Sequence, residues 1–134
     1  AAPEARFGLP EVRWGVYPFG GAALSLRQQI GHVHAMELIL AGKLVDAADA
    51  ARIGLINRVL PRDELMPWAI AMAETIAANS PMAVQAVKEQ ISATDHVQNY
   101  PREEMEQILG DRVRASPDFA EGIASFQEKR PANY

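Results

Sequence analysis

The strongest constraint on the fold is a repeated helix-start signal in the second half of the sequence. Ser80-Pro81 and Ser116-Pro117 each place a serine directly before a proline. Serine favours the N-cap position of a helix, and proline favours the first helical turn, where its missing N–H would have no partner anyway. Each pair is therefore expected to begin a helix.

Apolar residues around these signals have the spacing of amphipathic helices. Ahead of Ser80 the spacing alternates between three and four residues, at Leu65, Trp68, Ala69, Met72, Ala73, Ile76 and Ala77. The helix after Pro81 is expected to place Val84, Val87 and Ile91 on one face. A further helix is expected to open at Tyr100-Pro101, with Met105, Ile108, Leu109 and Val113 inside. The last helix is expected to bury Phe119, Ile123 and Phe126.

The sequence before residue 62 is mixed in character. We expect strands at Ala5–Leu9 and Leu55–Leu60, a turn at Pro18–Gly21, and helices at Gly21–Ile30, His34–Leu40 and from an Asp46 N-cap to about Gly54. Gly42 is expected to stop the second of these helices in a left-handed conformation. The predicted fold class is therefore α/β but mostly α, with residues 1–62 as a mixed part and residues 63–134 as a helical part.

Composition excludes several classes of function. The 134 residues suit one domain, and the net charge of −4 makes general nucleic-acid binding a poor fit. No apolar run approaches the roughly 20 residues that span a bilayer. The chain has no cysteine, which excludes disulfides, thiolate zinc sites and a cysteine nucleophile, and a cytoplasmic location is expected. Its start, AAPEARFGLPE, lacks an initiator Met and the pattern of a signal peptide, so the chain is expected to begin inside a longer protein.

Two groups of polar residues are assigned to structure rather than chemistry. The three histidines, His32, His34 and His96, do not have a convincing metal-ligand spacing, and no metal site is predicted. Three glutamates, Glu103, Glu104 and Glu106, follow Pro101, where they would complement a helix dipole on a solvated face. Arg112 and Arg114 are expected to be their solvated partners.

Two features leave a functional and a structural interpretation open. Glu11 lies between a strand-like segment and a glycine-rich turn, so it is either a surface glutamate or a carboxylate that points into a cleft. Lys129 and Arg130 follow Phe126 near the end of the last helix. These cations either meet the negative end of the helix dipole or contact a phosphate and an adenine ring.

Four stretches taken together resemble the second half of the enoyl-CoA hydratase/isomerase (crotonase) superfamily. They are FGLPEVRWGVYPFGG, AMELILAGKLVDAADAARIGLINRVLP, SPMAVQAVKE and SPDFAEGIASFQEKRPANY, in this order. The resemblance implies a spiral of ββα units followed by a helical region that forms trimers, often paired into hexamers. It also implies an acyl-CoA thioester as substrate, with CoA as part of the substrate and no separate cofactor.

The resemblance also implies roles for particular residues. Glu11 matches one of two catalytic glutamates of the family; the other glutamate and both oxyanion-hole donors belong to the earlier half. Phe126 and Lys129 match residues near the CoA adenine and 3′-phosphate. Substrate contact is expected at the turn formed by Pro18, Phe19 and Gly20. This turn departs from the common PGAGG pattern because Phe19 replaces a glycine, and Ala23-Leu24 replaces the usual Thr-Gln.

The leading hypothesis is a hydratase that adds water to a 2-enoyl-CoA through a thioester enolate and is active only with the missing N-terminal half. An isomerase of the same family, a non-catalytic assembly fragment and an all-helical binding module are the alternatives. A lone copy would leave sheet edges and apolar faces open, so a homo-oligomer is expected.

Overall fold

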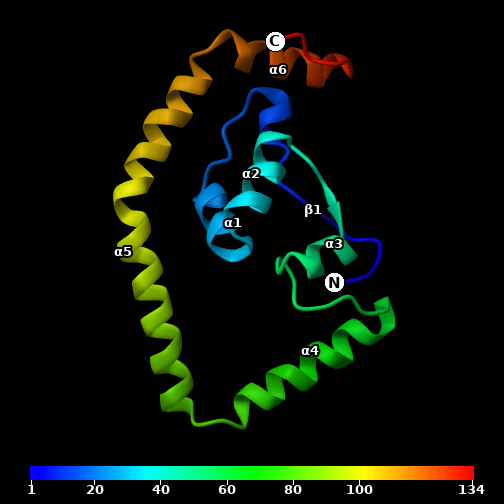
Figure 1. Cartoon of the computed structure of the whole chain (residues 1–134), viewed down its shortest axis with the longest axis vertical. Helices are drawn as coiled ribbons and strands as arrows, with labels where there is room; N and C mark the ends of the chain where they lie inside the picture. The colour runs from blue at the N-terminus through cyan, green and yellow to red at the C-terminus, as the bar shows by residue number, and fades with distance from the viewer.

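The computed structural model describes residues 1–93 and 104–134 with their side chains. The elements in chain order are β1 (Arg6–Phe7), η1 (Glu11–Trp14), α1 (Ala22–Ile30), α2 (His32–Leu40), β2 (Val45–Asp46), α3 (Ala47–Arg52), α4 (Arg62–Ala77), α5 (Pro81–Arg114) and α6 (Pro117–Glu128). Figure 1 shows α1, α2, α3 and β1 gathered in the middle, with α4 and α5 as long arms around them and α6 across one end.

The small core lies between α1, α2, β2 and α3. Its buried side chains are Ile30, Ala35, Leu38, Ile39, Val45 and Ala50. The helices that supply them agree with the expected ones, because Gly31 ends α1 with a φ of 78° and Gly42 follows α2 with a φ of 56°. These left-handed values suit glycine, which has no Cβ to clash. Local sequence signals therefore place this part of the core correctly.

The helix starts predicted from N-cap residues are confirmed. The Ser80 hydroxyl accepts from the Ala83 N–H at 3.5 Å, and the Ser116 hydroxyl accepts from the Phe119 N–H at 3.4 Å. Asp46 caps α3 by accepting from the Asp49 N–H at 2.8 Å. Each cap satisfies an N–H that has no partner within its own helix.

One helix, α5, occupies the whole range from Pro81 to Arg114. The prediction that a separate helix opens at Tyr100-Pro101 is therefore wrong. That pair, together with His96 and Glu103, lies outside the residues whose side chains are described.

The strand prediction is half right. β1 lies within the expected Ala5–Leu9 but pairs antiparallel with β2, in the register Arg6 to Asp46 and Phe7 to Val45. The expected strand Leu55–Leu60 is wrong, because this segment is irregular. Its first residues turn back onto the end of α3, where the Leu55 and Ile56 N–H groups donate to the Ala50 carbonyl at 2.8 and 3.3 Å, and the Leu60 N–H donates to the Ala1 carbonyl at 2.9 Å. A strand needs a neighbour along its length, and apolar β-branched residues alone do not supply one.

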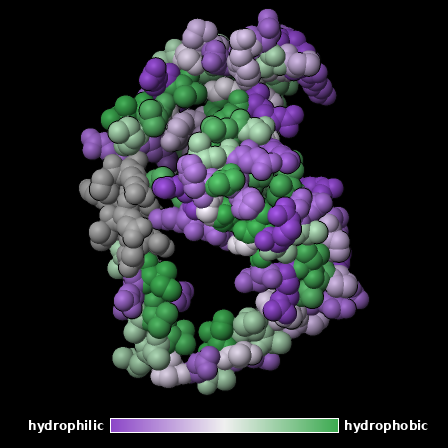
Figure 2. All heavy atoms as spheres, in the orientation of Figure 1, coloured by the Kyte–Doolittle hydropathy of each residue, from purple (hydrophilic) through white to green (hydrophobic). Residues whose placement is uncertain are grey.

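The apolar faces of α4 and the first part of α5 stand open. Met66, Ile70 and Ile76 of α4 are 66%, 52% and 48% exposed, and Val87 and Ile91 of α5 are 57% and 59% exposed. Figure 2 shows hydrophobic side chains along both arms in the lower part of the view. The predicted helical faces exist, but little of the described chain covers them. Within that described part, no helix is long and apolar enough to cross a membrane.

The buried face of α6 is not the predicted one. Ile123 and Phe126 are 41% and 66% exposed, whereas Gly122 and Ser125 are buried. A Cβ at Gly122 would lie 1.9 Å from the Trp14 carbonyl oxygen, so only glycine lets η1 approach so closely. The small residues of α6 therefore pack against η1, whereas Ile123 and Phe126 are more exposed.

Candidate functional site

Glu11 opens η1, a single turn that follows Leu9-Pro10. Its carbonyl oxygen accepts from the Val16 N–H at 3.1 Å, which bends the chain back at Gly15, where φ is 59°. The Oε2 atom of Glu11 is buried and has no hydrogen-bond partner among the residues whose side chains are described. A buried carboxylate oxygen with no partner is unfavourable, and such groups call for an explanation such as a water or a catalytic role. This atom is the most distinctive chemical feature of η1.

Helix α6 fixes the position of η1 from one side. The rings of Trp14 and Phe126 meet edge to face with centroids 5.8 Å apart. Gly15 also lies against α6, because a Cβ there would come within 2.4 Å of the Asp118 carbonyl oxygen. These contacts hold the turn that carries Glu11 against a regular helix. Phe126 thus packs on η1, although most of its surface stays exposed.

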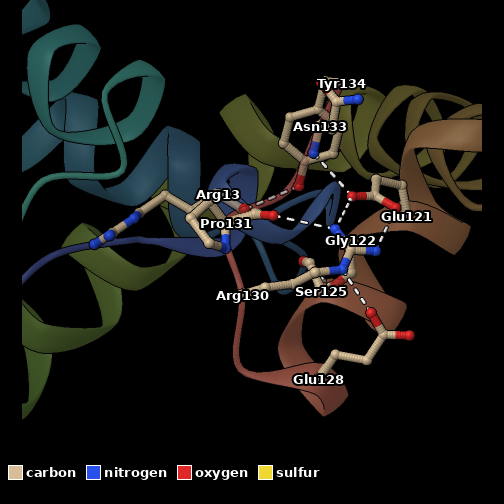
Figure 3. Close-up of polar contacts among 9 residues, drawn as sticks. All are labelled: Arg13, Glu121, Gly122, Ser125, Glu128, Arg130, Pro131, Asn133 and Tyr134. Atoms are coloured by element: carbon tan, nitrogen blue, oxygen red, sulfur yellow. Dashed lines mark hydrogen bonds and ion pairs between the residues drawn. The ribbon is translucent and has the colours of Figure 1, made fainter.

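The chain terminus forms a second support for η1, which we call the C-terminal clasp: Glu121, Arg130, Asn133 and Tyr134. The guanidinium of Arg130 donates to both carboxylate oxygens of Glu121, at 2.6 and 3.0 Å. The Asn133 N–H donates to the same carboxylate at 2.8 Å, and the Tyr134 hydroxyl donates to the Arg13 carbonyl at 2.8 Å. Figure 3 shows these contacts converging from α6 and the tail.

The clasp has a clear electrostatic signature. Hydrogen bonds from Arg130 and from the Asn133 N–H lower the pKa of Glu121 to about 2. Charge-assisted, two-pronged pairs of this kind are stronger than neutral hydrogen bonds. Arg130 is therefore engaged within the chain by Glu121 and by Glu128, at 2.5 Å.

Lys129 lies at the C-cap of α6 in a left-handed conformation, with φ of 53°. Its side chain is exposed, and the structure gives it no ion pair or side-chain hydrogen bond with any described residue. Of the two expected cations, Lys129 is therefore the one available for an anionic ligand. It lies three residues after Phe126, on the same end of α6.

An apolar pocket of ≈ 670 Å³ lies between the segment around η1, helices α1 and α2, and the last turns of α5. This volume falls in the range of small-molecule sites, about 300–1,000 Å³. The lining residues are Val12, Gly15, Val16, Tyr17, Pro18, Ala23, Leu24, Arg27, Ala35, Met36, Ile39, Leu40, Leu109, Arg112, Val113, Ser116 and Asp118. Its charged members, Arg27, Arg112 and Asp118, are exposed.

The expected site residues divide between this pocket and its surroundings. Pro18 lines the pocket, and Glu11 immediately precedes Val12, which also lines it. Glu11, Phe19, Gly20, Phe126 and Lys129 do not line it. Of the expected site residues, Pro18 is thus part of the pocket wall, Glu11 is next to a wall residue in the sequence, and Phe126 and Lys129 lie at the end of α6.

Phe19 and Gly20 instead contact α5. The N–H groups of Gly20 and Gly21 donate to the Glu106 carboxylate at 2.6 to 3.1 Å. The Phe19 ring lies against Gly110, and the guanidinium of Arg114 sits 4.3 Å from the ring centroid. The expectation that Glu106 lies on a solvated face is therefore wrong. Arg114 is partly exposed as expected, but it pairs with Asp111 and with the Phe19 ring.

Sequence reasoning missed this contact because its partners lie 85 and 86 residues apart. One available signal was Gly110, since a glycine inside a helix needs a reason to outweigh its low helix propensity. The other was the spacing of Glu106, Gly110 and Arg114, which puts them on one side of a helix.

The same site has no metal-binding cluster among the residues that the structure describes. His32 and His34 lie in the first turn of α2, whose residues Ala35, Met36, Ile39 and Leu40 line the apolar pocket, whereas Glu11 lies on η1. What the described arrangement offers is an apolar volume and a half-buried glutamate, Glu11, whose Oε2 atom is buried and which immediately precedes a residue of the pocket wall. Such a combination suits an apolar substrate that undergoes proton transfer.

Comparison with known proteins gives a consistent result. The family model described as enoyl-CoA hydratase/isomerase matches residues 1–134. Enoyl-CoA hydratase EchA19 of Mycobacterium tuberculosis is 37% identical over 100% of this chain and 50% of its own length. The 2,3-dehydroadipyl-CoA hydratase of Escherichia coli is 32% identical over 100% of this chain and 52% of its own length.

A solved structure agrees with the sequence comparison. The carnitinyl-CoA hydratase from Mycobacterium avium superposes with a TM-score of 0.92 at 35% identity, covering 100% of this chain and 52% of that one. The chain thus spans about half the length of the relatives it matches. Its small mixed core and long helices are part of a crotonase fold. The chain belongs to the enoyl-CoA hydratase/isomerase family.

Proposed function

We propose that this chain is the C-terminal part of an enzyme that hydrates 2-enoyl-CoA thioesters. The observation that carries the proposal is the buried Oε2 atom of Glu11, which has no hydrogen-bond partner in the described part of the chain and belongs to the residue just before Val12 of the pocket wall. A family match over residues 1–134 and relatives named as hydratases support the reaction class. The acyl chain would occupy the apolar pocket.

In the proposed reaction, Glu11 acts together with a glutamate from the other half of the enzyme. One carboxylate takes a proton from a water molecule while the oxygen of that water bonds to C3 of the enoyl group. The C2–C3 π electrons move toward the thioester carbonyl, and the resulting enolate is protonated at C2. Backbone N–H donors of the other half would stabilise the enolate oxygen, each by about 3–4 kcal/mol.

The CoA part of the substrate is assigned to the end of α6. Lys129 is exposed and lacks an ion-pair partner among the described residues, so it is free to meet a phosphate. Phe126 presents an exposed ring three residues earlier, to which a flat adenine could stack. Pro18, Phe19 and Gly20 would shape the acyl end, Pro18 as part of the pocket wall.

The test is a substitution at Glu11 in the complete enzyme, formed by this chain and the other half. Glu11→Gln keeps the shape of the side chain but removes its proton-accepting charge. Turnover of crotonyl-CoA should fall by about 10²- to 10⁴-fold with little change in KM. Glu64→Gln, which neutralises a carboxylate in the first turn of α4, is the matched control and should leave turnover unchanged. Near-normal turnover in Glu11→Gln would remove Glu11 from the mechanism.

A further inference from the structure

The turn Pro18–Gly21 is fastened to α5 by three residues of that helix, at four-residue intervals. We call this set the turn latch: Glu106, Gly110 and Arg114 on α5, with Phe19, Gly20 and Gly21 on the turn. Residues four apart on a helix lie on the same side. The latch therefore joins one continuous strip of α5 to a turn that lies more than 80 residues earlier in the sequence.

Glu106 forms the polar part of the latch. Gly20 and Gly21 have φ values of 77° and 69°, which direct successive N–H groups toward one point just before α1. Consecutive N–H groups in such conformations form an anion-binding concavity, and the helix N-terminus adds favourable partial charge. The Glu106 carboxylate fills that position, with both of its oxygens accepting hydrogen bonds. Burial and the nearby charge of Glu106 raise the pKa of Tyr17.

Phe19 and Gly110 form the apolar part. A Cβ on Gly110 would lie 1.9 Å from Cζ of the Phe19 ring, so the ring occupies the space that a side chain would take. Tyr17 meets the same ring edge to face at 5.3 Å, and the Arg114 guanidinium covers it at 4.3 Å. The ring is thus held from three sides, and α5 cannot approach the turn more closely.

The latch lies directly beside the apolar pocket. Leu109 and Val113 of α5 line the pocket and are sequence neighbours of Gly110 and Arg114, while Pro18 lines it from the turn. The distance between α5 and the turn therefore sets the width of the pocket at this end. The charged and apolar contacts of the latch fix that distance.

We infer that the turn latch determines how long an acyl chain the pocket accepts, by holding the α5 wall at a fixed distance. The inference rests on the proposed function, because it treats the pocket as the acyl site. Each additional methylene that the pocket buries should tighten binding about fourfold. Beyond the length that fills the pocket, further methylenes should add nothing while the latch is closed.

The experiment uses the complete enzyme, formed by this chain and the other half, and compares the wild type with a Glu106→Ala variant, which removes the carboxylate. Glu104→Ala is the matched control, because Glu104 is an exposed carboxylate on the same helix. Hydrogen exchange at the Gly20 and Gly21 amides reports the latch itself and should be about tenfold faster or more in Glu106→Ala only. Dissociation constants for butanoyl-, octanoyl- and dodecanoyl-CoA report the pocket.

We expect affinity of the wild-type enzyme and of Glu104→Ala to level off at a shorter acyl length than in Glu106→Ala. Phe19→Leu replaces the ring by a smaller apolar side chain and should also raise the acyl length at which affinity levels off. This variant takes the place of Glu106→Ala if Glu106→Ala does not fold. If the amides exchange faster but the length limit is unchanged, the inference is wrong. If the complete wild-type enzyme binds none of the three thioesters, the proposed function fails with the inference. Hydration of crotonyl-CoA with an unchanged limit would overturn only the inference.

Discussion

At the scale of single residues, three side chains carry most of the argument, and each owes its role to a neighbour. Glu11 has a buried oxygen without a hydrogen-bond partner among the described residues, and it lies on η1, which packs against α6 through Trp14 and Gly15. Phe19 occupies the space over Gly110 because that helical position has no Cβ. Lys129 stays unpaired, among the described residues, because Glu121 and Glu128 bind Arg130 instead. The chemical role of each residue depends on the backbone of another segment.

The effect of Gly110→Ala on the free energy of unfolding should depend on the residue at position 19, and it should change sign when Phe19 is replaced by alanine. In the wild-type chain, Gly110→Ala introduces a Cβ that clashes with the Phe19 ring, and overpacking of this kind destabilises by about 1–3 kcal/mol. In a Phe19→Ala background the clash is absent, so the same change should stabilise by up to about 1 kcal/mol through helix propensity. Urea unfolding of the four proteins measures this coupling.

Gly122→Ala is the matched control for this cycle. Its Cβ would lie 1.9 Å from the Trp14 carbonyl oxygen, and no change at Phe19 relieves that contact. It should therefore destabilise in both backgrounds. Equal effects of Gly110→Ala with and without Phe19 would show that the ring does not rest on α5.

At the scale of elements, what could be predicted from the sequence is what depends on neighbours along the chain. The N-caps at Ser80 and Ser116 and the glycine ends of α1 and α2 are local features, and the structure confirms them. The segment Leu55–Leu60 has strand-like residues but lacks a strand beside it in the described chain, so it stays irregular. The turn latch links residues too far apart for any periodicity to reveal.

The buried face of α6 was predicted wrongly because it, too, depends on a contact with a distant segment. Spacing identified its apolar residues correctly, but it could not show that η1 would press on the small residues. Gly122 and Ser125 are buried because a backbone, rather than a side chain, lies against them. The candidate site was likewise only partly predictable: Glu11 came from a motif, whereas the pocket wall from α5 came from the tertiary fold.

The C-terminal clasp should respond to pH in a defined window. The pKa of Glu121 is about 2 in the folded chain and 4.5 without its partners, so the carboxylate binds protons less readily when folded. Its contribution to stability is therefore complete above about pH 5 and is lost as the pH falls toward 2. The Asn133 amide chemical shift should titrate with a midpoint near 2 and should lose that transition in Glu121→Gln.

A midpoint near 4.5 for the Asn133 amide would contradict the clasp. Arg130→Ala provides an independent comparison, because it removes the principal cause of the lowered pKa. In this variant the amide should titrate at a higher pH than in the wild-type chain. Tyr134→Phe, which removes only the bond to Arg13, should leave the Glu121 midpoint close to that of the wild type.

At the scale of the whole molecule, the chain combines a small closed core with two long arms that are largely open. The exposed apolar residues of α4 and the first part of α5 form a surface of the kind that marks protein–protein contacts. We expect the chain to assemble through this surface, either with further copies or with the other half of the enzyme. The pocket lies at the opposite end of α5, near α6.

Light scattering with size exclusion should show the 14.6 kDa chain in an assembly larger than a monomer. Ile70→Glu places a charge on the open face of α4 and should shift the mass toward the monomer. Val33→Glu is the control, because Val33 is 74% exposed and belongs to α2 rather than to either arm. A stable monomer of the wild-type chain at high concentration would contradict this expectation.

Glu11 is proposed to take part in adding water to an enoyl thioester. The most direct measurement determines whether the hydroxyl oxygen of the product comes from water. The complete enzyme is incubated with crotonyl-CoA in oxygen-18 water, and the product is analysed by mass spectrometry. We predict a 3-hydroxyacyl-CoA that carries one heavy oxygen at C3, formed far more slowly by Glu11→Gln than by Glu64→Gln. A product without heavy oxygen, or equal rates in the two variants, would contradict it.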